Sequence, residues 1–449
     1  MQKDLSEQYA VSVPRYTSYP TAPHFHAGVT NGTYRNWLGA LATGSEMSLY
    51  IHVPFCDRLC WFCACHTKQI LRYGPLSHYL EALYKEIDAV SSLINPGVRV
   101  SAVHFGGGSP TMLKPQDIVK LDRKLRAAFQ YLPEVEISVE IDPNDMDDAR
   151  FDALAQIGMT RVSLGVQDFD PKVQKAINRE QSFEQTKAVV DGARLRGVAS
   201  VNLDLLYGLP HQTCDSVEET MRQALTLGPD RIALFGYAHV PWLKKHQTMI
   251  DEATLPDAAQ SFEQARRAGA LIVASGYEAI GLDHFALPRD SLAKAKRSGA
   301  MRRNFQGYTV DPSDTLIGLG ASSIGRLPQG YIQNCTATGE YERMAAEAGL
   351  AAVRGYVLSD DDRMRAWVIE RLMCDFSFSQ TEMLGRFGDG AGAILDQAKL
   401  LAATDSTGQF ERRGDDFTVT EGARPLVRLI AAKFDVYLGK GAARHSAAV

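Results

Sequence analysis

Long hydrophobic runs are absent from this 449-residue sequence: nothing approaches 18 consecutive apolar residues, so we expect no transmembrane helix. Residues 1–7 contain no apolar signal core, and we find neither low-complexity segments nor long-period repeats. An excess of one charge is also missing, because 48 Lys and Arg stand against 53 Asp and Glu, a formal charge of −5. We therefore expect a soluble protein that binds neither nucleic acid nor a membrane.

Cysteines are few and unevenly placed. The chain contains seven, and four of them fall within residues 56–65. This distribution does not resemble the disulfide framework of a secreted protein. We therefore expect a cytoplasmic protein, since a reactive thiolate cluster also needs a reducing compartment.

Strand-like and helix-like stretches alternate from about residue 45 to residue 290. The strand-like runs cover residues 48–55, 100–105, 135–141, 161–166, 200–207 and 231–237, and helical periodicity lies between them. Six such units predict a parallel sheet with helical crossovers, whereas a complete barrel has eight. We predict an α/β fold, a partial (β/α)6 barrel, with a doubly wound sheet as the alternative. Residues 278–285 could add another strand.

The segments around this barrel predict further parts. Residues 1–44 form an N-terminal arm, because the prolines within 14–23 oppose a helix. The barrel covers 45–290. Residues 291–354 form an extension that closes the active site, in which the glycine-rich stretch 318–325 reads as a loop packed tightly against other backbone. Residues 355–449 predict a mostly helical, winged-helix-like C-terminal domain, with helices at 360–374, 380–387, 391–401 and 423–437 and a hairpin at 410–419. Its mixed charge favours a cap over the catalytic mouth rather than a DNA-binding role.

Chemically special residues follow the predicted strands at their carboxyl ends, where α/β barrels build active sites. Alternation along the third strand puts its apolar residues against the outer helices, so Glu140 points into the barrel. Asn202 and Asp204 share the inner face of the fifth strand, and Tyr50 and His52 share that of the first. An inward carboxylate must have partners, which a bound cofactor would supply. The alternatives are a structural salt bridge for Glu140 and Asp204, and a hydrogen-bonded core histidine for His52.

Three cysteines stand as C-x3-C-x2-C directly after the first strand, at Cys56, Cys60 and Cys63. They are one thiolate short of the four that close a cubane iron–sulfur cluster or a structural zinc site. One iron of a four-iron cluster would therefore stay open to a ligand from solution. Two other interpretations remain: a zinc site completed by Cys65 or His66, and a redox dithiol of Cys60 and Cys63.

This spacing resembles that of the radical S-adenosylmethionine (SAM) superfamily, in which SAM binds the open iron of a [4Fe-4S] cluster. Most of the chain further resembles the oxygen-independent coproporphyrinogen III oxidases (coproporphyrinogen dehydrogenases) of haem biosynthesis. The resemblance is carried by residues 14–20, the cysteine run, 104–110, 165–169, 178–180, 204–210, 283–285 and 304–308. A haem chaperone that shares the cluster motif is the alternative, and Cys65 and residues 14–20 favour the oxidase.

The resemblance implies roles residue by residue. Cys56, Cys60 and Cys63 ligate the cluster, whereas Cys65 matches a fourth, non-ligating cysteine. The residues implied to contact the SAM on the cluster are Tyr50, Gly107, Glu140 and Ile324. Those implied to contact a second SAM are Phe62, Gly108, Ser109, Gln167, Arg179, Asp204 and Ala238. The residues implied to serve catalysis are Tyr50, Glu140, Phe305 and Gln306.

The implied reaction converts two propionates of coproporphyrinogen III to vinyl groups through a 5′-deoxyadenosyl radical, giving protoporphyrinogen IX. It consumes SAM, and it needs an electron donor for the cluster and an electron acceptor. Four substrate carboxylates require local cations in a net-acidic protein, so Arg15, Arg179, Arg302 and Arg303 are candidate partners, although Arg179 fits SAM better. We expect a monomer.

Overall fold

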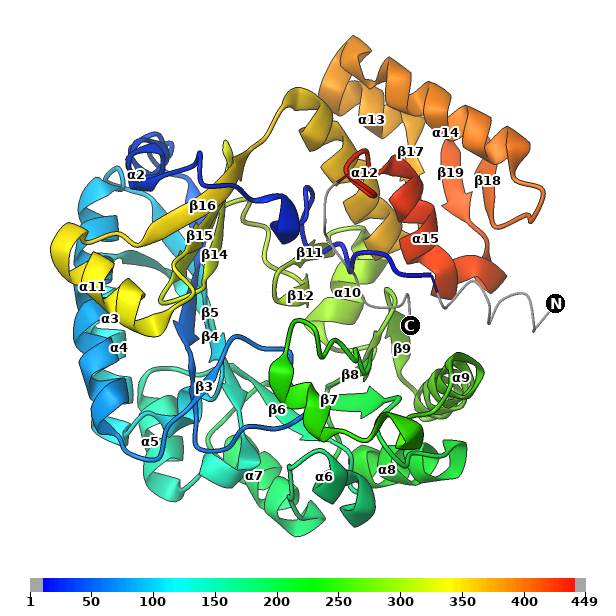
Figure 1. Ribbon diagram of the computed structural model, residues 1–449. Coiled ribbons are helices and arrows are strands. Elements are labelled where there is room, and N and C mark those ends of the chain that lie inside the picture. Colours follow the sequence, from blue (N-terminus) through cyan, green and yellow to red (C-terminus); the bar gives the residue numbers. More distant parts are fainter. Residues whose placement is uncertain (1–10, 441–449) are drawn as a thin grey trace.

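The computed structural model describes residues 11–440. Six parallel strands run in chain order through the middle of a 12-stranded sheet. These strands are β1 (Glu46–Val53), β4 (Arg99–Gly107), β5 (Gln130–Ile141), β6 (Arg161–Gln167), β7 (Ser200–Tyr207) and β8 (Arg231–Gly236). A doubly wound sheet would reverse this order at a switch point, so that alternative is wrong and the predicted partial (β/α)6 barrel is confirmed (Figure 1).

Helices cover the outside of the curved sheet (Figure 1). They are α3 (Gly74–Leu93), α4 (Pro115–Ala128), α5 (Asp148–Gln156), α6 (Pro171–Ala176), α7 (Phe183–Leu195), α8 (Cys214–Thr226) and α9 (Ala258–Ala274). The strands alternate as predicted: Ile137 and Val139 of β5 and Leu203 of β7 are buried in the main core with the helices. Polar residues of the same strands therefore face the inside of the barrel.

Both edges of the parallel sheet carry additional strands. Beside β8 lies the antiparallel pair β10 (His284–Ala286) and β9 (Glu278–Ile280), which is the strand region expected at 278–285. Beside β1 lie β13 (Leu316–Leu319), parallel to it, and then β14 (Ile324–Leu327), β15 (Gly330–Asn334) and β16 (Ala352–Val357). Helix α11 (Thr338–Ala348) packs on α3. Much of the segment 291–354 thus continues the barrel sheet, and its role in closing the site stays a prediction.

The stretch 318–325, expected to be a loop, instead contains the end of β13 and the start of β14. Its glycines allow close packing of backbones. A Cβ on Gly318 would lie 2.9 Å from the backbone of Ile324, and one on Gly320 would lie 2.6 Å from the carbonyl oxygen of His52. These distances leave no room for a side chain.

A separate layer forms the C-terminal part, in orange and red in Figure 1. It contains α12 (Asp360–Asp375), β17 (Ser377–Ser379), α13 (Gln380–Phe387), α14 (Gly392–Thr404), β18 (Phe410–Arg413), β19 (Asp416–Val419) and α15 (Val427–Ala431). This order, with β17, β19 and β18 in one small sheet, agrees with the winged-helix-like prediction. The single helix expected at 423–437 is wrong, because 3-10 turns at 421–426 and 432–434 flank the short α15. Pro425 accounts for the first of these turns, since it lacks an N–H and disfavours a helical residue before it.

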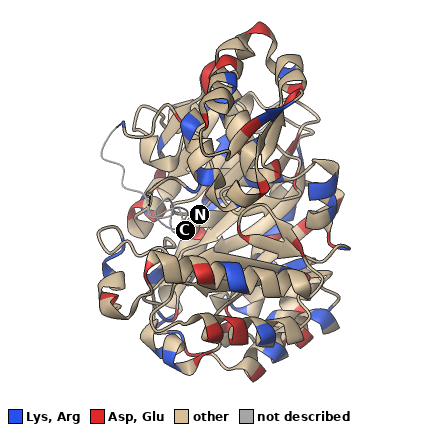
Figure 2. Cartoon of the chain, turned by 90° about the vertical axis from the view of Figure 1, so that its right-hand side faces the viewer, with Lys and Arg blue, Asp and Glu red and all other residues tan. Residues whose placement is uncertain are grey.

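The remaining elements lie between barrel and C-terminal domain or at the arm. They are α2 (Asn31–Gly39), α10 (Ser291–Ser298) and the hairpin β11 (Arg302–Asn304) to β12 (Gly307–Thr309), with the short pair β2 (Phe55–Cys56) and β3 (Lys68–Gln69) beyond β1. Lysine, arginine, aspartate and glutamate are mixed over the face seen in Figure 2. Within residues 11–440 we find no helix long and apolar enough to cross a membrane.

Candidate active site

The cysteine loop, which we define as residues 56–66, leaves the end of β1 and is held by the segment after β8. Three side chains of that segment donate to its carbonyl oxygens. Lys244 Nζ lies 2.8 Å from the oxygen of Cys65, His246 Nε2 lies 2.6 Å from that of Cys63, and Gln247 Nε2 lies 2.9 Å from that of Phe62. The loop is therefore fixed by its backbone, which leaves the thiols to other partners.

All three motif cysteines are free thiols. Burial, together with the nearby charges of Cys63 and Cys60, raises the pKa of Cys56 to about 12. Buried thiols that repel one another as thiolates fit a cationic centre that would deprotonate them. Within residues 11–440 no three His, Cys, Asp or Glu side chains converge on one ion position, whereas the thiolates of a cubane cluster bind different irons. The donor set thus fits a [4Fe-4S] cluster.

The glycine run after β4 lies against the root of this loop. A Cβ on Gly107 (φ +120°) would lie 2.8 Å from the ring of His52, and one on Gly108 would lie 2.6 Å from the carbonyl oxygen of Phe55. The backbone N–H groups of Gly108 and Ser109 donate to Val53 and Phe55. Gly107 and Gly108 are therefore needed to bring the end of β4 against the start of the cysteine loop.

Glu140 lies inside the barrel as predicted. One carboxylate oxygen is 3.1 Å from His104 Nε2, and the other accepts the N–H of Gly107 at 3.0 Å. Burial acts to raise the pKa of Glu140, but its hydrogen bonds to His104 and to the N–H of Gly107 outweigh burial, so the pKa is lowered. The side chain nevertheless keeps 40% of its exposure. The carboxylate is therefore ionised and still open to a further donor.

Tyr50 and His52 lie beside Glu140 and form a chain across the barrel top. The hydroxyl of Tyr50 is 2.9 Å from His52 Nδ1, and His52 Nε2 is 2.9 Å from the carbonyl oxygen of His66. The ring of Tyr50 stacks on His104 with centroids 5.7 Å apart. Burial lowers the pKa of His52 to about 4, so the imidazole is neutral. His52 thus connects the barrel interior to the cysteine loop.

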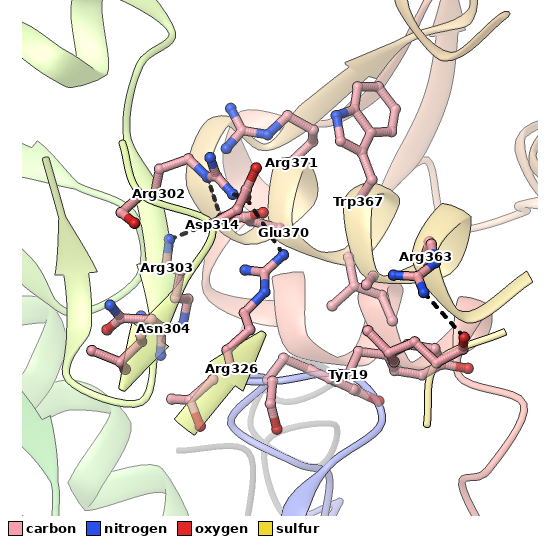
Figure 3. Close-up of a pocket in the computed structure, with 18 of the residues that line it drawn as sticks. Tyr19, Arg302, Arg303, Asn304, Asp314, Arg326, Arg363, Trp367, Glu370 and Arg371 are labelled. Atoms are coloured by element: carbon pink, nitrogen blue, oxygen red, sulfur yellow. Dashed lines mark hydrogen bonds and ion pairs between the residues drawn. The ribbon is translucent and has the colours of Figure 1, made fainter. Parts of the chain in front are cut away.

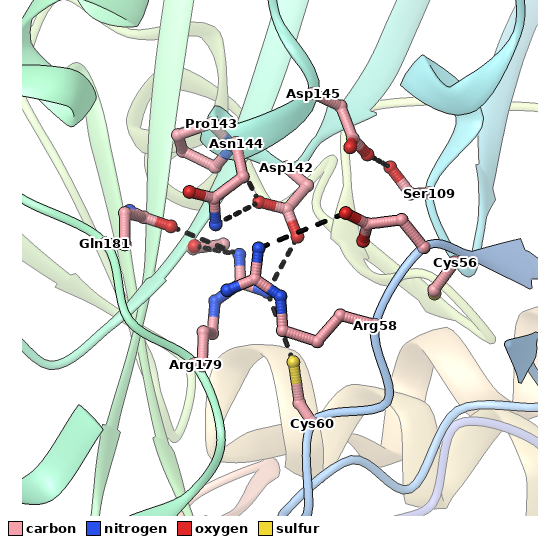
Figure 4. A network of polar contacts seen from close by, with 12 residues as sticks. Cys56, Arg58, Cys60, Ser109, Asp142, Pro143, Asn144, Asp145, Arg179 and Gln181 are labelled. Atoms are coloured by element: carbon pink, nitrogen blue, oxygen red, sulfur yellow. Dashed lines mark hydrogen bonds and ion pairs between the residues drawn. The ribbon is translucent and has the colours of Figure 1, made fainter. Parts of the chain in front are cut away.

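Arg179 links the loop to the neighbouring strands and is more than nine-tenths buried (Figure 4). Its guanidinium donates to Asp142 at 2.9 Å, to the carbonyl oxygen of Gly165 at 2.6 Å and to the sulfur of Cys60 at 3.5 Å. The positive charge therefore lies directly against a proposed cluster ligand. In the same figure Ser109 donates to Asp145, whose pKa burial raises to about 6.

The other residues implied to contact a second SAM lie at the same end of the sheet. Asp204 accepts hydrogen bonds from Ser163 and Asn202, both at 2.8 Å. Gln167, with φ +68°, ends β6. The carbonyl oxygens of Phe62 and Ala238 are joined by one side chain, because Gln247 Nε2 donates to both, at 2.9 and 3.2 Å. Sequence reasoning missed Gln247, since nothing in its local pattern marks it.

Ile324, Phe305 and Gln306 are placed further from the cysteine loop. Ile324 begins β14, whose backbone abuts Gly318, the residue of β13 that pairs with Tyr50. Phe305 and Gln306 form the tip of the β11–β12 hairpin, where Phe305 packs edge-on against Tyr331 at 5.8 Å. No contact recorded within residues 11–440 joins this tip to the cysteine loop.

A cavity of about 590 Å³ lies next to this hairpin, between the arm, β14 and α12. Arginines from several elements surround it, but they differ in their partners (Figure 3). Arg302 is ion-paired to Asp314 at 2.7 Å and to Glu370 at 2.9 Å. Its charge is therefore neutralised by the protein itself, which makes it a poor choice for a substrate carboxylate.

Comparison with known proteins agrees with this geometry. The sequence model of the radical SAM superfamily matches residues 50–224, which contain the cysteine loop, Glu140 and Asp204. The chain is 48% identical to an oxygen-independent coproporphyrinogen III oxidase from Bradyrhizobium diazoefficiens, over 100% of both chains. It is also 48% identical to the enzyme of that name from Paracoccus denitrificans, over 97% of this chain and 96% of the relative.

A solved structure provides the same result. Coproporphyrinogen III oxidase from Escherichia coli, described as a radical SAM enzyme, superposes with a TM-score of 0.90 at 38% identity, over 94% of this chain and 97% of that one. The class is thus that of the radical SAM enzymes, which bind a [4Fe-4S] cluster and SAM. Within it, the chain belongs to the oxygen-independent coproporphyrinogen III oxidase family.

Proposed function

We propose that this chain catalyses the oxygen-independent oxidative decarboxylation of two propionate side chains of coproporphyrinogen III, giving the two vinyl groups of protoporphyrinogen IX. The observation that carries the proposal is the position of Glu140. Its ionised, partly exposed carboxylate lies at the end of the barrel where the cysteine loop, Arg179 and Asp204 also meet. The names of the full-length relatives support the substrate.

A cluster held by Cys56, Cys60 and Cys63, with SAM, would supply the 5′-deoxyadenosyl radical that takes a hydrogen from a propionate β-carbon. Each propionate then loses CO2 and one further electron, which an acceptor must receive. The protein binds and orients these groups. In this proposal Glu140 offers an acceptor to the SAM amino group, and Gly107, whose N–H already donates to Glu140, and Ile324 are further contacts of the same SAM. Tyr50 and His52 hold the cysteine loop against Glu140.

We infer that a second SAM binds beside the first. The residues implied to contact it, including Arg179, Asp204 and Ala238, lie at one end of three neighbouring strands. Asp204 has two donors from the protein, and burial raises its pKa, so an additional hydroxyl donor from a ribose would suit it. Equilibrium dialysis of anaerobic protein against SAM should give two molecules bound per chain. A value of one would refute the second site.

We propose that Phe305 and Gln306 act on the substrate rather than on SAM, and that the C-terminal domain caps the mouth. In this arrangement Phe305→Ala lowers product formation and leaves substrate-free reductive cleavage of SAM unchanged. The enzyme is proposed to act as a monomer, with an external one-electron donor for the cluster. Gel filtration of the reconstituted protein tests the oligomeric state.

Anaerobic turnover provides the decisive test. Reconstituted protein, given SAM, a reductant and an electron acceptor, should convert coproporphyrinogen III to protoporphyrinogen IX with CO2 release. Tight haem binding without vinyl product would refute the proposal and indicate a haem chaperone. Zinc without iron or sulfide would refute the cluster. Cys60→Ala should abolish both the cluster absorption and the activity.

A further inference from the structure

A second cavity, of about 280 Å³, lies beside the carboxyl ends of β7 and β8. Tyr207 and Gly236, the last residues of these strands, line it, so it opens at the same end of the barrel as Asp204. Its other walls come from α9, the β9–β10 segment, α10, the arm, the β11–β12 hairpin and the C-terminal domain. Apolar residues including Leu234, Phe235 and Phe285 make up much of its surface. The cavity thus lies where the barrel, the arm, the hairpin and the C-terminal domain meet.

The charge of this cavity is strongly one-sided. Its lining contains one carboxylate, Asp283. The carboxylate of Asp283 is 2.7 Å from His284 Nδ1, and its charge also acts on Arg303 and Arg15, but one carboxylate cannot balance all the cations around it. The cationic side chains that line the same cavity are Arg15, Arg266, Lys296, Arg303, Arg424 and Arg428. Arg266 is ion-paired to Glu263 at 2.6 Å, which leaves the positive charge on the other side of the cavity, where Arg303 and Arg15 lie. In a chain with a net charge of −5, such a concentration of positive charge indicates a site for an anion.

Arg303 is the cation whose environment most needs an anion. Its side chain is 8% exposed, and Nη2 donates to the carbonyl oxygen of Arg15 at 3.3 Å. Within residues 11–440, Nε and Nη1 have no hydrogen-bond partner and no carboxylate lies within ion-pair distance. The guanidinium lies 4.3 Å from the ring centroid of Tyr308, which compensates part of the charge. A buried guanidinium with two unpartnered nitrogens is unfavourable unless a ligand supplies the missing hydrogen bonds and a negative charge.

Arg15 brings a second guanidinium to the same cavity from the arm. Its side chain is exposed, and Nη2 donates to the carbonyl oxygen of Gly236 at 3.0 Å. Since Arg303 donates to the backbone of Arg15, the two cations are neighbours. A carboxylate entering the cavity would therefore meet both.

We propose that this cavity binds one propionate-bearing pyrrole ring of the tetrapyrrole, with Arg303 and Arg15 as the partners of its carboxylate. This inference depends on the proposed function. The volume suits one substituted ring rather than a macrocycle, because pockets for drug-sized ligands begin at about 300 Å³. The apolar walls contact the ring, and the paired guanidiniums bind the carboxylate. Arg303 and Arg15 are positioning residues, since their task is to hold the substrate.

Substrate affinity tests the assignment. Anaerobic equilibrium dialysis of full-length, cluster-loaded and SAM-loaded protein with coproporphyrinogen III gives Kd for the parent protein and for Arg303→Gln and Arg15→Gln. A hydrogen-bonded ion pair contributes about 1.5–3 kcal/mol, so each variant should raise Kd, and KM in parallel, by roughly 10- to 100-fold. Reductive cleavage of SAM without substrate should stay within about twofold, which separates substrate positioning from damage to the cofactor site.

Arg297→Gln is the charge-matched control. Arg297 is ion-paired to Glu278 outside the cavity, so this variant removes the same charge and should keep the parent Kd. An unchanged Kd in both Arg303→Gln and Arg15→Gln, or an equal rise in Arg297→Gln, would overturn the subsite. If Arg303→Gln does not fold, the exposed Arg15 decides the result alone. Parent protein that neither binds nor converts coproporphyrinogen III would instead overturn the proposed function.

Discussion

Replacing Gln247 by alanine should loosen the cysteine loop and release its iron. Gln247 is fully buried, and its amide donates to the carbonyl oxygens of Phe62 and Ala238 while accepting from the N–H of Val240. Each buried group left without its partner costs about 1–3 kcal/mol. If the substitution destabilises the closed state of the loop by about 3 kcal/mol relative to the open state, the population of the open state rises roughly 100-fold.

The matched control is Gln264→Ala. Gln264 is also buried, and its amide likewise joins backbone groups at the ends of barrel elements, the N–H of Gly208 at 2.9 Å and the carbonyl oxygen of Gln212 at 3.1 Å. It makes no recorded contact with the cysteine loop. Both variants should therefore lower the melting temperature, but only Gln247→Ala should act on iron retention.

The assay is the rate at which an iron chelator bleaches the reconstituted, SAM-free protein under anaerobic conditions. Gln247→Ala should lose its cluster absorption tens of times faster than Gln264→Ala. Equal rates in the two variants would refute the reasoning, because they would show that the amide of Gln247 stabilises the fold in general and not the loop. A slower loss than in the parent protein would refute it as well.

Three further predictions concern carboxylates. Glu140→Gln should weaken SAM binding roughly 10- to 100-fold by calorimetry, while the control Glu136→Gln, on the same strand and paired with Arg161, should leave SAM affinity unchanged. Because the pKa of Glu140 is lowered, the SAM affinity of the parent protein should stay level from about pH 6 to 8. A loss of affinity toward the acid end of that range would contradict the assignment. Asp142→Asn should lower the free energy of unfolding by about 3–5 kcal/mol, since it leaves Arg179 buried without its ion pair; a loss below about 1 kcal/mol in urea would contradict this. Burial raises the pKa of Glu86 to about 7, above its unfolded value near 4.5, so the folded state binds more protons than the unfolded state between these values. The free energy of unfolding therefore falls as pH rises through this range, by up to about 3 kcal/mol. Glu86→Gln should remove this pH dependence in urea titrations at about pH 5 and 8, and an unchanged pH dependence would contradict the prediction.

The barrel and its inner carboxylates could be predicted because the alternation of apolar and polar residues along each strand determines which side chains point inward. Alternation with a period of two places Glu140 and Asp204 on the inner face once the strands are recognised. The order of the strands follows from their connections, which cross over to the next parallel neighbour. Both inferences are local and need no knowledge of distant contacts.

The partners of these residues could not be predicted in the same way. Gln247 is 185 residues from Phe62 along the chain, and Arg179 is 119 residues from Cys60. Amides, histidines and arginines carry no periodic signal that would mark such a pairing. The glycines of 318–325 were ambiguous for another reason. A run of glycines is compatible both with a loop, which was expected, and with strands packed closely together, which was found. Only the position of the neighbouring backbone distinguishes a loop from packed strands.

The arm connects the C-terminal domain to the carboxyl end of β8. The domain holds the arm through its backbone and rings: Arg428 donates to the carbonyl oxygens of Val13 and Pro14, and the hydroxyl of Tyr16 donates to Asp435 at 3.0 Å. Tyr16 is buried in the core of this domain, whereas the side chain of Arg15, one residue earlier, turns to Gly236 of β8. Two consecutive residues of the arm thus face opposite partners, at a point where the backbone of Tyr16 is left-handed, with φ +48°. The position of Arg15 over the barrel is therefore set by a domain that lies more than 400 residues further along the chain.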